Sequence, residues 1–314
     1  MLLPILSLLA GFILLMWSAD TFTDNGAKIA RIFNISPLVI GLLIFGFGTS
    51  APEMLVSGLA AYDGHPEMSI GNAFGSNILN IGLVLGVTAI ILPITVEKSV
   101  LKKEWLFLFL STLIVGFLLL DGFLSFTDGL ILISLLTLFL INVFRESKKN
   151  NLTDSDNDSL ENNSQKNDKG RTWLLLIVSL IILVSSARLV VWGGTSLALS
   201  FGVSDLIIGL TVVALGTSLP ELAVSISSAL KKQHQMVIGN IIGSNLFNTL
   251  GVLAIPGLIL PFQIPTEVMS RDFIFMLMFT LLVLILSMRL KISRFGGFIL
   301  LTALAIYLYQ LFWI

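Results

Sequence analysis

The hydrophobic positions of this chain gather into long apolar stretches that short polar segments separate. Most stretches reach the length of about 20 residues that an α-helix needs to cross the hydrocarbon core of a bilayer. The pattern therefore predicts an all-α membrane protein with ten transmembrane helices. We expect these helices near residues 2–16, 37–62, 68–92, 104–122, 124–144, 172–197, 204–230, 236–259, 272–289 and 295–314.

A six-residue motif in the second apolar stretch occurs again in the seventh. Residues 48–53 read G-T-S-A-P-E and residues 216–221 read G-T-S-L-P-E, an offset of 168 residues. The same offset aligns a second motif, G-N-x-x-G-S-N-x-x-N, at residues 71–80 and 239–248. A repeat of this extent indicates that the chain contains two copies of one fold unit. Because each unit has an odd number of helices, the second enters the membrane from the opposite face, which predicts two inverted five-helix repeats.

The basic residues are distributed unevenly over the polar segments. Of the 18 Lys and Arg residues, 16 fall in alternate loops, after the first, third, fifth, seventh and ninth predicted helices. The positive-inside rule places such loops in the cytoplasm, so both termini are expected outside, at a plasma or inner cell membrane. No basic residue precedes the stretch 2–16, and residues 17–20 form a poor cleavage site. We therefore expect a membrane helix there and not a signal peptide.

Residues 147–170 form the only long polar segment, rich in Asn, Asp, Ser and Lys. Such a composition cannot bury a core, so we expect a solvated cytoplasmic linker between a first repeat at 1–146 and a second at 171–314. The D-x-D-x-D stretch at 154–158 imitates the start of an EF-hand loop. It lacks the glycine and the glutamate that such a loop needs at its sixth and twelfth positions, so a linker is favoured over a calcium sensor.

The composition supports a membrane protein and narrows its chemistry. Hydrophobic residues make up 55% of the 314 residues and charged residues 12%, and the mean hydropathy is +0.97. This is far more apolar surface than a soluble core could bury. The absence of cysteine excludes disulfides, thiolate metal ligands and thiol catalysis. We expect the lipid bilayer as the environment, with no nucleic-acid partner and no obligate protein partner.

Two glutamates, Glu53 and Glu221, fall near the centres of predicted helices. A charge at that depth costs about 2.5–3.5 kcal/mol, so something must stabilise it. The proline before each glutamate removes one backbone N–H, which leaves a carbonyl oxygen of the preceding turn without its helical partner. The threonine four residues before each glutamate lies on the same helix face. Together these groups predict an all-oxygen site for a hard cation.

The second motif adds further oxygen atoms from neighbouring helices. Its polar residues recur every four positions and so line one stripe of each helix: Asn72, Ser76 and Asn80 in the first copy, and Asn240, Ser244 and Asn248 in the second. The simpler interpretation is that such side chains bond helices together, and that the glycines of the motif allow close packing. It is incomplete, because neither glutamate has a Lys or Arg within its own or an adjacent polar stripe. A bound cation or a proton must neutralise the pair.

Arg188 is the basic residue that falls inside a predicted helix, and the repeat aligns it with Asp20. In an inverted repeat these two residues lie toward opposite membrane surfaces. We therefore expect each to extend to its own surface and not to pair with the other. His65 and His234 lie in or beside predicted loops and are expected to be solvated, so no histidine metal site or catalytic dyad is predicted.

With both motif pairs, the sequence resembles the cation/calcium exchanger superfamily (CaCA) and is similar to prokaryotic sodium/calcium exchangers along essentially the whole chain. The resemblance implies that helices 1 and 6 slide across a core of helices 2, 3, 7 and 8, and that ions bind within this core. Asn248 stands where some members of the superfamily carry aspartate. The residues that match the superfamily's ligand positions are Glu53, Glu221, Thr49, Ser50, Thr217, Ser218, Ser76, Asn80, Ser244, Asn248, Gly46 and Ala214.

The resemblance implies a secondary antiporter that exchanges Ca2+ for Na+ by alternating access, which is a transporter without a prosthetic group and not an enzyme. One Ca2+ or two Na+ would balance two carboxylates, so both ions would compete for one site. Exchange with H+ or dependence on K+ is an alternative, and Asn248 leaves the stoichiometry open. A cation channel would also need oxygen ligands, but an inverted repeat with broken helices favours a transporter. An intramembrane hydrolase would need a positioned nucleophile, and none is visible.

Overall fold

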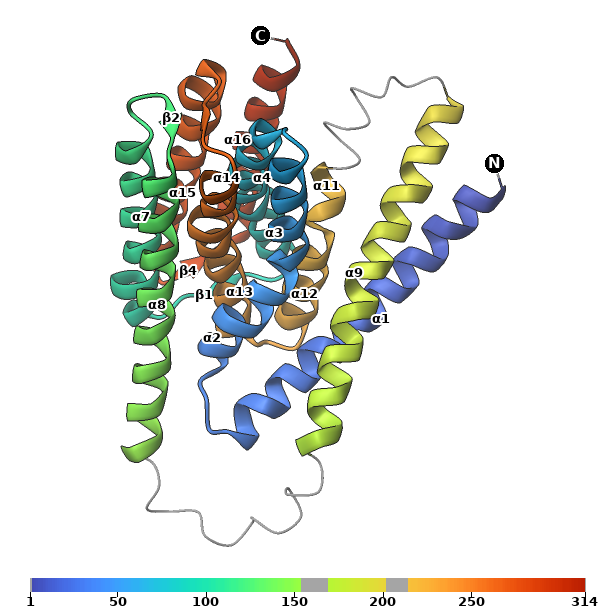
Figure 1. Ribbon diagram of the computed structural model, residues 1–314. Helices are drawn as coiled ribbons and strands as arrows, with labels where there is room; N and C mark the ends of the chain where they lie inside the picture. Colours follow the sequence, from blue (N-terminus) through green and yellow to red (C-terminus); the bar gives the residue numbers. More distant parts are fainter. Residues whose placement is uncertain (1, 154–168, 202–213, 314) are drawn as a thin grey trace, which may run out of the picture.

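The computed structural model describes residues 2–153, 169–201 and 214–313, and these ranges are almost entirely helical (Figure 1). Helices and π-helical segments (η) follow one another and often form one continuous rod. The first half contains α1 (Leu2–Ile32), α2 (Pro37–Ile40), η1 (Gly41–Phe45), α3 (Gly46–Tyr62), α4 (Pro66–Leu79), η2 (Asn80–Leu85), α5 (Gly86–Ile91), α6 (Lys98–Val100), η3 (Leu101–Trp105), α7 (Leu106–Leu118) and α8 (Phe126–Thr153). The second half contains α9 (Lys169–Ser200), α11 (Ala214–Thr217), α12 (Leu219–Leu230), α13 (His234–Leu246), η6 (Phe247–Val252), α14 (Ala254–Ile259), η7 (Val268–Phe273), α15 (Ile274–Ser287) and α16 (Arg294–Trp313).

Eight helical runs among the described residues are long and apolar enough to cross a membrane, which indicates a multi-pass membrane protein. Each of them overlaps a helix that the sequence pattern predicts. The predicted helix at 104–122 contains α7, and the one at 204–230 is described only from Ala214 onwards, as α11 and α12. The eight runs are Leu2–Ile32, Pro37–Tyr62, Pro66–Ile91, Phe126–Arg145, Lys169–Ser200, His234–Ile259, Val268–Ser287 and Arg294–Leu311.

Helix α1 is longer than the sequence pattern predicts, because it continues past residue 16 through a polar segment to Ile32. Phe22 and Ile29 in this extension are buried in a cluster with residues of α12 and α13. Asp20, which we expected to extend to the surface, is exposed and also forms an ion pair with Lys231. These tertiary contacts stabilise helical turns whose own composition is polar.

The ends of the predicted linker are helical as well. Helix α8 continues to Thr153 and α9 begins at Lys169, so both helices overlap the ends of the segment 147–170. The acidic stretch at 154–158 lies outside the described residues.

The prolines of the first motif differ in their effect on the two copies. Helix α3 continues through Pro52, with the π-helical segment η1 directly before it. In the second copy the helix is interrupted at Ser218, between α11 and α12, and Pro220 lies in the first turn of α12. A helix break beside the glutamate is therefore present in the second copy and absent from α3.

Two short antiparallel strand pairings, which the sequence pattern did not predict, connect the halves. Strand β1 (Ile94–Thr95) pairs with β4 (Lys291–Ile292), and β2 (Phe123–Leu124) pairs with β3 (Phe262–Gln263). The offset of 168 residues carries β1 onto β3 and β2 onto β4, with the same register. Each pairing is therefore the repeat equivalent of the other.

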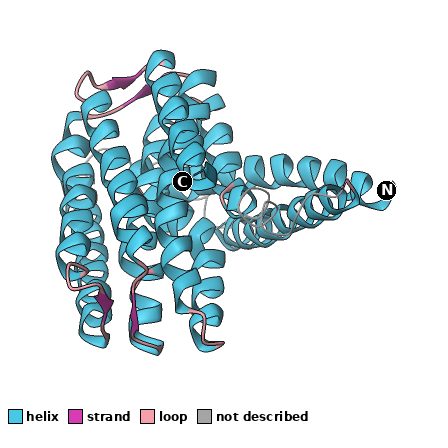
Figure 2. Ribbon diagram, turned by 90° about the horizontal axis from the view of Figure 1, so that it is seen from above, coloured by secondary structure: helices cyan, strands magenta, loops and turns pink. Residues whose placement is uncertain are grey.

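Helices α1 and α9 form a pair of their own beside the other helices. They pack along each other, and the pair touches the rest mainly where α1 meets α12 and α2, and where α9 meets α11, α12 and α3. Figures 1 and 2 both show the pair leaning away from the other helices toward the N-terminal end of α1. The remaining helices form one bundle that contains both copies of both motifs.

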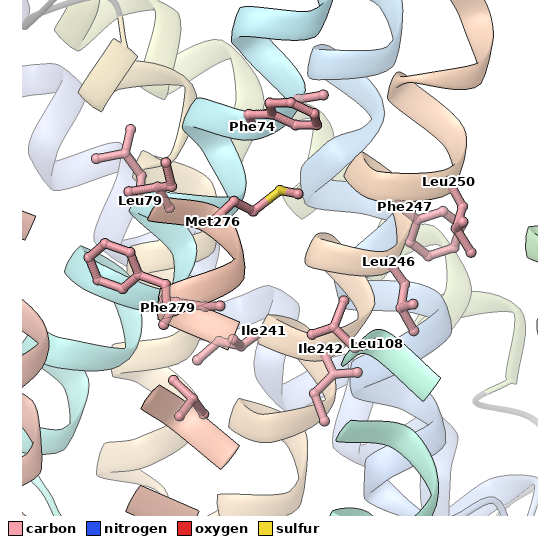
Figure 3. Close-up of a cluster of buried hydrophobic side chains, with 14 of the residues drawn as sticks. Phe74, Leu79, Leu108, Ile241, Ile242, Leu246, Phe247, Leu250, Met276 and Phe279 are labelled. Carbon is pink, nitrogen blue, oxygen red and sulfur yellow. The ribbon is translucent and has the colours of Figure 1, made fainter. Parts of the chain in front are cut away.

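The larger hydrophobic core lies inside this bundle. Phe74 of α4, Ile242 of α13, Phe247 of η6, and Met276 and Phe279 of α15 are all buried there (Figure 3). These side chains come from both halves of the chain. Their close packing holds the motif-bearing helices as one rigid body.

Gly46 and Gly243 meet where α3 crosses α13. A Cβ atom at Gly46 would lie 2.8 Å from the Cα atom of Gly243, and a Cβ atom at Gly243 would lie 2.5 Å from the carbonyl oxygen of Leu42. A larger residue at either position would force the helices apart. The close packing expected for the glycines of the second motif is therefore present at Gly239 and Gly243. It is absent at Gly71 and Gly75, where an added Cβ atom would meet nothing within 4 Å.

We predict that Gly46→Ala lowers the apparent Tm of the detergent-solubilised protein, because the added methyl group overpacks the crossing at a cost of about 1–3 kcal/mol. Gly58→Ala in the same helix is the matched control. Its Cβ atom would meet Ile255 at an ordinary 3.6 Å, so the higher helix propensity of alanine should keep or slightly raise the Tm. Equal losses of Tm in both variants would show that the crossing is not tight.

Candidate functional site

Two carboxylates lie deep in the bundle. Glu53 of α3 and Glu221 of α12 are each only 1% exposed, and α3 and α12 contact each other. Within the described residues neither carboxylate has an ion-pair partner. Two carboxyl groups are therefore buried without a positive charge from the described residues beside them.

An asparagine supports each glutamate in the same way. The side-chain amide of Asn72 donates to the carbonyl oxygen of Glu53 at 3.2 Å and to the hydroxyl of Ser57 at 3.0 Å. The amide of Asn240 donates to the carbonyl oxygen of Glu221 at 3.3 Å and to the hydroxyl of Ser225 at 3.0 Å. These bonds join α4 to α3 and α13 to α12. Both copies of the repeat thus fix the backbone of their glutamate with equivalent contacts.

The two copies also meet across the site. Helix α3 packs against α13 and η6 of the second half, and α12 packs against η2 of the first half. The hydroxyls of Thr49 and Ser244 lie 3.2 Å apart, and the Ser244 hydroxyl donates to the carbonyl oxygen of Gly46 at 3.5 Å. Each copy of the first motif therefore faces the second motif of the other copy.

Many polar atoms around the glutamates are buried without a hydrogen-bond partner in the described structure. An unpaired polar atom in a protein interior costs about 1–3 kcal/mol, and a charged one costs more. Their concentration here indicates oxygen atoms arranged for a species other than the protein itself. These atoms are Oε2 of Glu53, both carboxylate oxygens of Glu221, the hydroxyls of Ser50 and Ser218, Oδ1 of Asn80, Oδ1 of Asn240, and both side-chain amide atoms of Asn248.

The structure brings most of the predicted site residues into this region. Thr49, Ser50, Ser76, Asn80, Ser218, Ser244 and Asn248 are all buried. Asn80 begins η2 and Asn248 lies in η6, the segments that pack against the opposite first motif. Thr217 at the end of α11 is half-buried and makes a further interaction within the protein. Ala214 is the first residue of α11, and Gly46 is the first residue of α3.

Sequence reasoning missed several supporting residues. Ser57 and Ser225 each lie four residues after their glutamate, on the same helix face, and are related by the repeat offset. This spacing was the signal that could have identified them. Asn77 donates to the Thr249 hydroxyl at 2.7 Å and so links α4 to η6. That pair joins positions without a repeat relationship, and the sequence contains no signal for it.

The arrangement suits a hard cation. Carboxylate, hydroxyl, amide and carbonyl oxygens are the ligands that Ca2+ and Na+ accept, and six to eight such oxygens commonly surround Ca2+. In the part of the chain that the structure describes, no cluster of three or more His, Cys, Asp or Glu side chains is placed to hold a metal ion. Two carboxylates among neutral oxygens are a set of ligands that a hard cation accepts.

Comparisons with known proteins find relatives that cover nearly the whole chain. The family model described as sodium/calcium exchanger protein matches residues 3–145 and 171–313. CaxA of Alkalimonas amylolytica is 41% identical over 99% of both chains, and the inner membrane protein YrbG of Escherichia coli (strain K12) is 35% identical over 100% of this chain and 98% of its own. A structure of the sodium-calcium exchanger NCX_Mj, soaked with zero Na+ and Ca2+, superposes with a TM-score of 0.86 at 37% identity, covering 99% of each chain.

We predict that Asn240→Ala destabilises the protein more than Asn72→Ala. Asn240 is fully buried, whereas Asn72 is half-buried, so water can replace the lost amide only at Asn72. Leaving the Glu221 carbonyl and the Ser225 hydroxyl unpaired should cost about 1–3 kcal/mol.

Thermal unfolding in detergent without Ca2+ or Na+ measures both losses. The double variant Asn240→Ala/Ser225→Ala should lose less stability than the sum of its single variants, because the two residues share one hydrogen bond. Strict additivity would contradict the contact.

Proposed function

The chain belongs to the sodium/calcium exchanger family, and on that premise we propose that it exchanges Ca2+ for Na+ across a membrane by alternating access. Members of this family are ion exchangers and not enzymes, and Ca2+ and Na+ are their transported ions. The single observation that carries the proposal is the buried pair Glu53 and Glu221, which forms no ion pair with any described residue. A transported cation supplies the positive charge.

Electroneutrality favours exchange over one-way transport. Two carboxylates are balanced by one Ca2+ or by two Na+, so either ion can stabilise the buried site, while an empty site keeps two like charges in a poorly solvated interior. A site that moves between the two faces only when it is neutralised couples the two ion flows. This coupling is the basis of antiport.

We propose the same oxygen atoms as the ligands. The carboxylates of Glu53 and Glu221 are the central ligands, and hydroxyl, amide and carbonyl oxygens complete the shell. Burial of unpaired oxygens at Ser50, Ser218 and Asn248 supports this assignment. The remaining proposed ligands are Thr49, Thr217, Ser76, Ser244, Asn80, Gly46 and Ala214.

We also propose that the fold consists of ten transmembrane helices in two inverted repeats, at 1–146 and 171–314. The family model matches each half separately, at 3–145 and 171–313. The equivalent bonds of Asn72 and Asn240, and the two equivalent strand pairings, support the same division. In this arrangement α1 and α9 slide across the bundle and expose the site to one side at a time.

The membrane and its orientation follow from the same premise. We propose a plasma or inner cell membrane, with both termini outside and the linker 147–170 in the cytoplasm. The alternate loops that carry 16 of the 18 basic residues support this orientation. YrbG of Escherichia coli is an inner membrane protein, which supports the assignment to this membrane.

We predict that Glu53→Gln and Glu221→Gln each abolish Na+-driven 45Ca2+ uptake into vesicles. Each change keeps the shape of the side chain but leaves a single negative charge for a divalent ion. Glu67→Gln is the matched control, because Glu67 is an exposed carboxylate at the start of α4. Its uptake should equal that of the unchanged protein. Full activity in either of the first two variants contradicts the shared site, and Ca2+ flux that needs no counter-ion identifies a channel.

We predict further that acid inhibits transport and that Ca2+ relieves the inhibition. A proton on either glutamate removes charge that the cation needs, so protons and Ca2+ compete for the same oxygens. Initial rates measured over pH at several Ca2+ concentrations should show an inhibition midpoint that moves to lower pH as Ca2+ rises. A midpoint that does not depend on Ca2+ would place the titrating group outside the site.

A further inference from the structure

Lys231 makes a charged contact between α1 and α12. Its Nζ atom lies 2.7 Å from Oδ1 of Asp20 and 2.7 Å from Oδ1 of Asp24, and it donates to the carbonyl oxygen of Asp20 at 2.9 Å. The Ser227 hydroxyl donates to Asp20 at 3.2 Å. This group of residues, here named the Lys231 contact, fastens α1 to the end of the helix that carries Glu221.

The repeat gives Lys231 an equivalent in Asp63. Lys231 is the C-terminal cap of α12, and Asp63, 168 residues earlier, is the C-terminal cap of α3. The next residues, Lys232 and Gly64, both have a positive φ, of 59° and 86°. The backbone N–H of each cap residue donates to the carbonyl oxygen four residues earlier. Both helices therefore end in the same turn, and each turn presents a charged side chain.

The partner of Lys231 also has an equivalent, and both charges are reversed. Asp20 of α1 aligns with Arg188 of α9, while Lys231 aligns with Asp63. Each pair of positions thus holds one positive and one negative side chain. The negative one lies on α1 in the first pair, whereas the positive one lies on α9 in the second pair. If these side chains only extended into water, a change of sign from Asp20 to Arg188 would not require a change of sign from Lys231 to Asp63. Asp63 and Arg188 therefore still carry opposite charges, which indicates a contact between them.

The second pair is not engaged in this structure. Asp63 and Arg188 are both exposed, and neither takes part in an ion pair within the described residues. The packing of α1 is also tighter than that of α9 at equivalent positions. Ile29 of α1 is 1% exposed, whereas its repeat equivalent, Leu197 of α9, is half-buried. One member of a pair of equivalent interfaces is closed and the other is not.

We propose that Asp63 and Arg188 form an ion pair when the site faces the other side of the membrane, replacing the Lys231 contact; this inference rests on the proposed exchange function. Helix α3 rises from α2, and α12 runs the opposite way below α11 (Figure 1), so the caps lie at opposite ends of the bundle. The Lys231 contact holds α1 against one end. The Asp63–Arg188 contact holds α9 against the other.

The two contacts act as opposing stabilisers of two states. A partly exposed ion pair changes an equilibrium by up to about five-fold. Removing Lys231 therefore shifts the population toward the state that contains the Asp63–Arg188 contact, and removing Arg188 shifts it away. Neither pair touches the proposed ligands, so their removal changes rates and populations and leaves the ion site intact.

Cross-linking tests the proposal directly, because the chain has no cysteine of its own. Two variants, Asp20→Cys/Lys231→Cys and Asp63→Cys/Arg188→Cys, are reconstituted in vesicles and treated with a short bifunctional thiol reagent. The yield is read by mass spectrometry. We expect cross-linking in the first variant, which also reports correct folding. We expect cross-linking in the second variant too, with a yield that rises about two- to five-fold when Lys231→Ala is added.

Flux provides the second measurement. Asp63→Ala and Arg188→Ala should each lower maximal 45Ca2+ exchange about two- to five-fold, and the charge-exchanged variant Asp63→Arg/Arg188→Asp should recover it. Glu67→Ala, an exposed acidic residue in the first turn of α4 whose repeat equivalent is the neutral Gln235, is the matched control and should keep full flux.

The outcomes separate the contact from the exchange function. Cross-linking of Asp63→Cys/Arg188→Cys in a protein without Na+-driven flux supports the contact and overturns the proposed function. Normal exchange with no cross-linking of this pair, in the presence or absence of Lys231→Ala, overturns the contact alone. Failure of the Asp20→Cys/Lys231→Cys variant to cross-link, in a protein that still exchanges ions, contradicts the Lys231 contact and with it the proposed replacement.

Discussion

Two carboxylates buried in one helix bundle, without an ion-pair partner among the described residues, constrain the rest of the structure. Their like charges repel each other, and the apolar surroundings give them little solvation. A soluble protein would expose or pair such groups. Here the neighbouring positions are filled by hydroxyl, amide and carbonyl oxygens, which can share a cation but cannot replace one. The stability of the bundle and the proposed ion binding therefore depend on the same atoms.

The repeat allows two carboxylates to lie at the same depth in the bundle. One helix can place only one carboxylate at a given depth with its supporting groups, so the second comes from an equivalent helix of the other half. Asn72 and Asn240 fix the two backbones by equivalent bonds, and Thr49 meets Ser244 across the halves. Helices α1 and α9 remain outside this rigid body and contact it over limited areas. Alternating access requires a rigid site and a separate group of helices that can move beside it.

The sequence located the two buried carboxylates better than it located the helix ends. Glu53 and Glu221 were identified because a carboxylate in an apolar stretch is costly, and the repeat offset located their partners. The extension of α1 to Ile32 was not predictable from hydropathy, because its polar turns are stabilised by Lys231 and by contacts with α12, which are distant in sequence. The strand pairings between halves and the Asn77–Thr249 bond depend likewise on tertiary placement. The local sequence pattern indicates which positions are buried and which secondary structure they form. It does not indicate which distant residue completes a contact.

The most direct test of a shared site is to locate a bound ion. Crystals grown with Ca2+ and without Na+, measured at a wavelength where Ca2+ scatters anomalously, should show one peak between α3 and α12. Oxygen atoms of both Glu53 and Glu221 should lie about 2.3–2.6 Å from it, and the peak should disappear when Na+ replaces Ca2+. A Ca2+ peak that contacts only one of the two glutamates, or that lies elsewhere in the protein, would contradict the shared site.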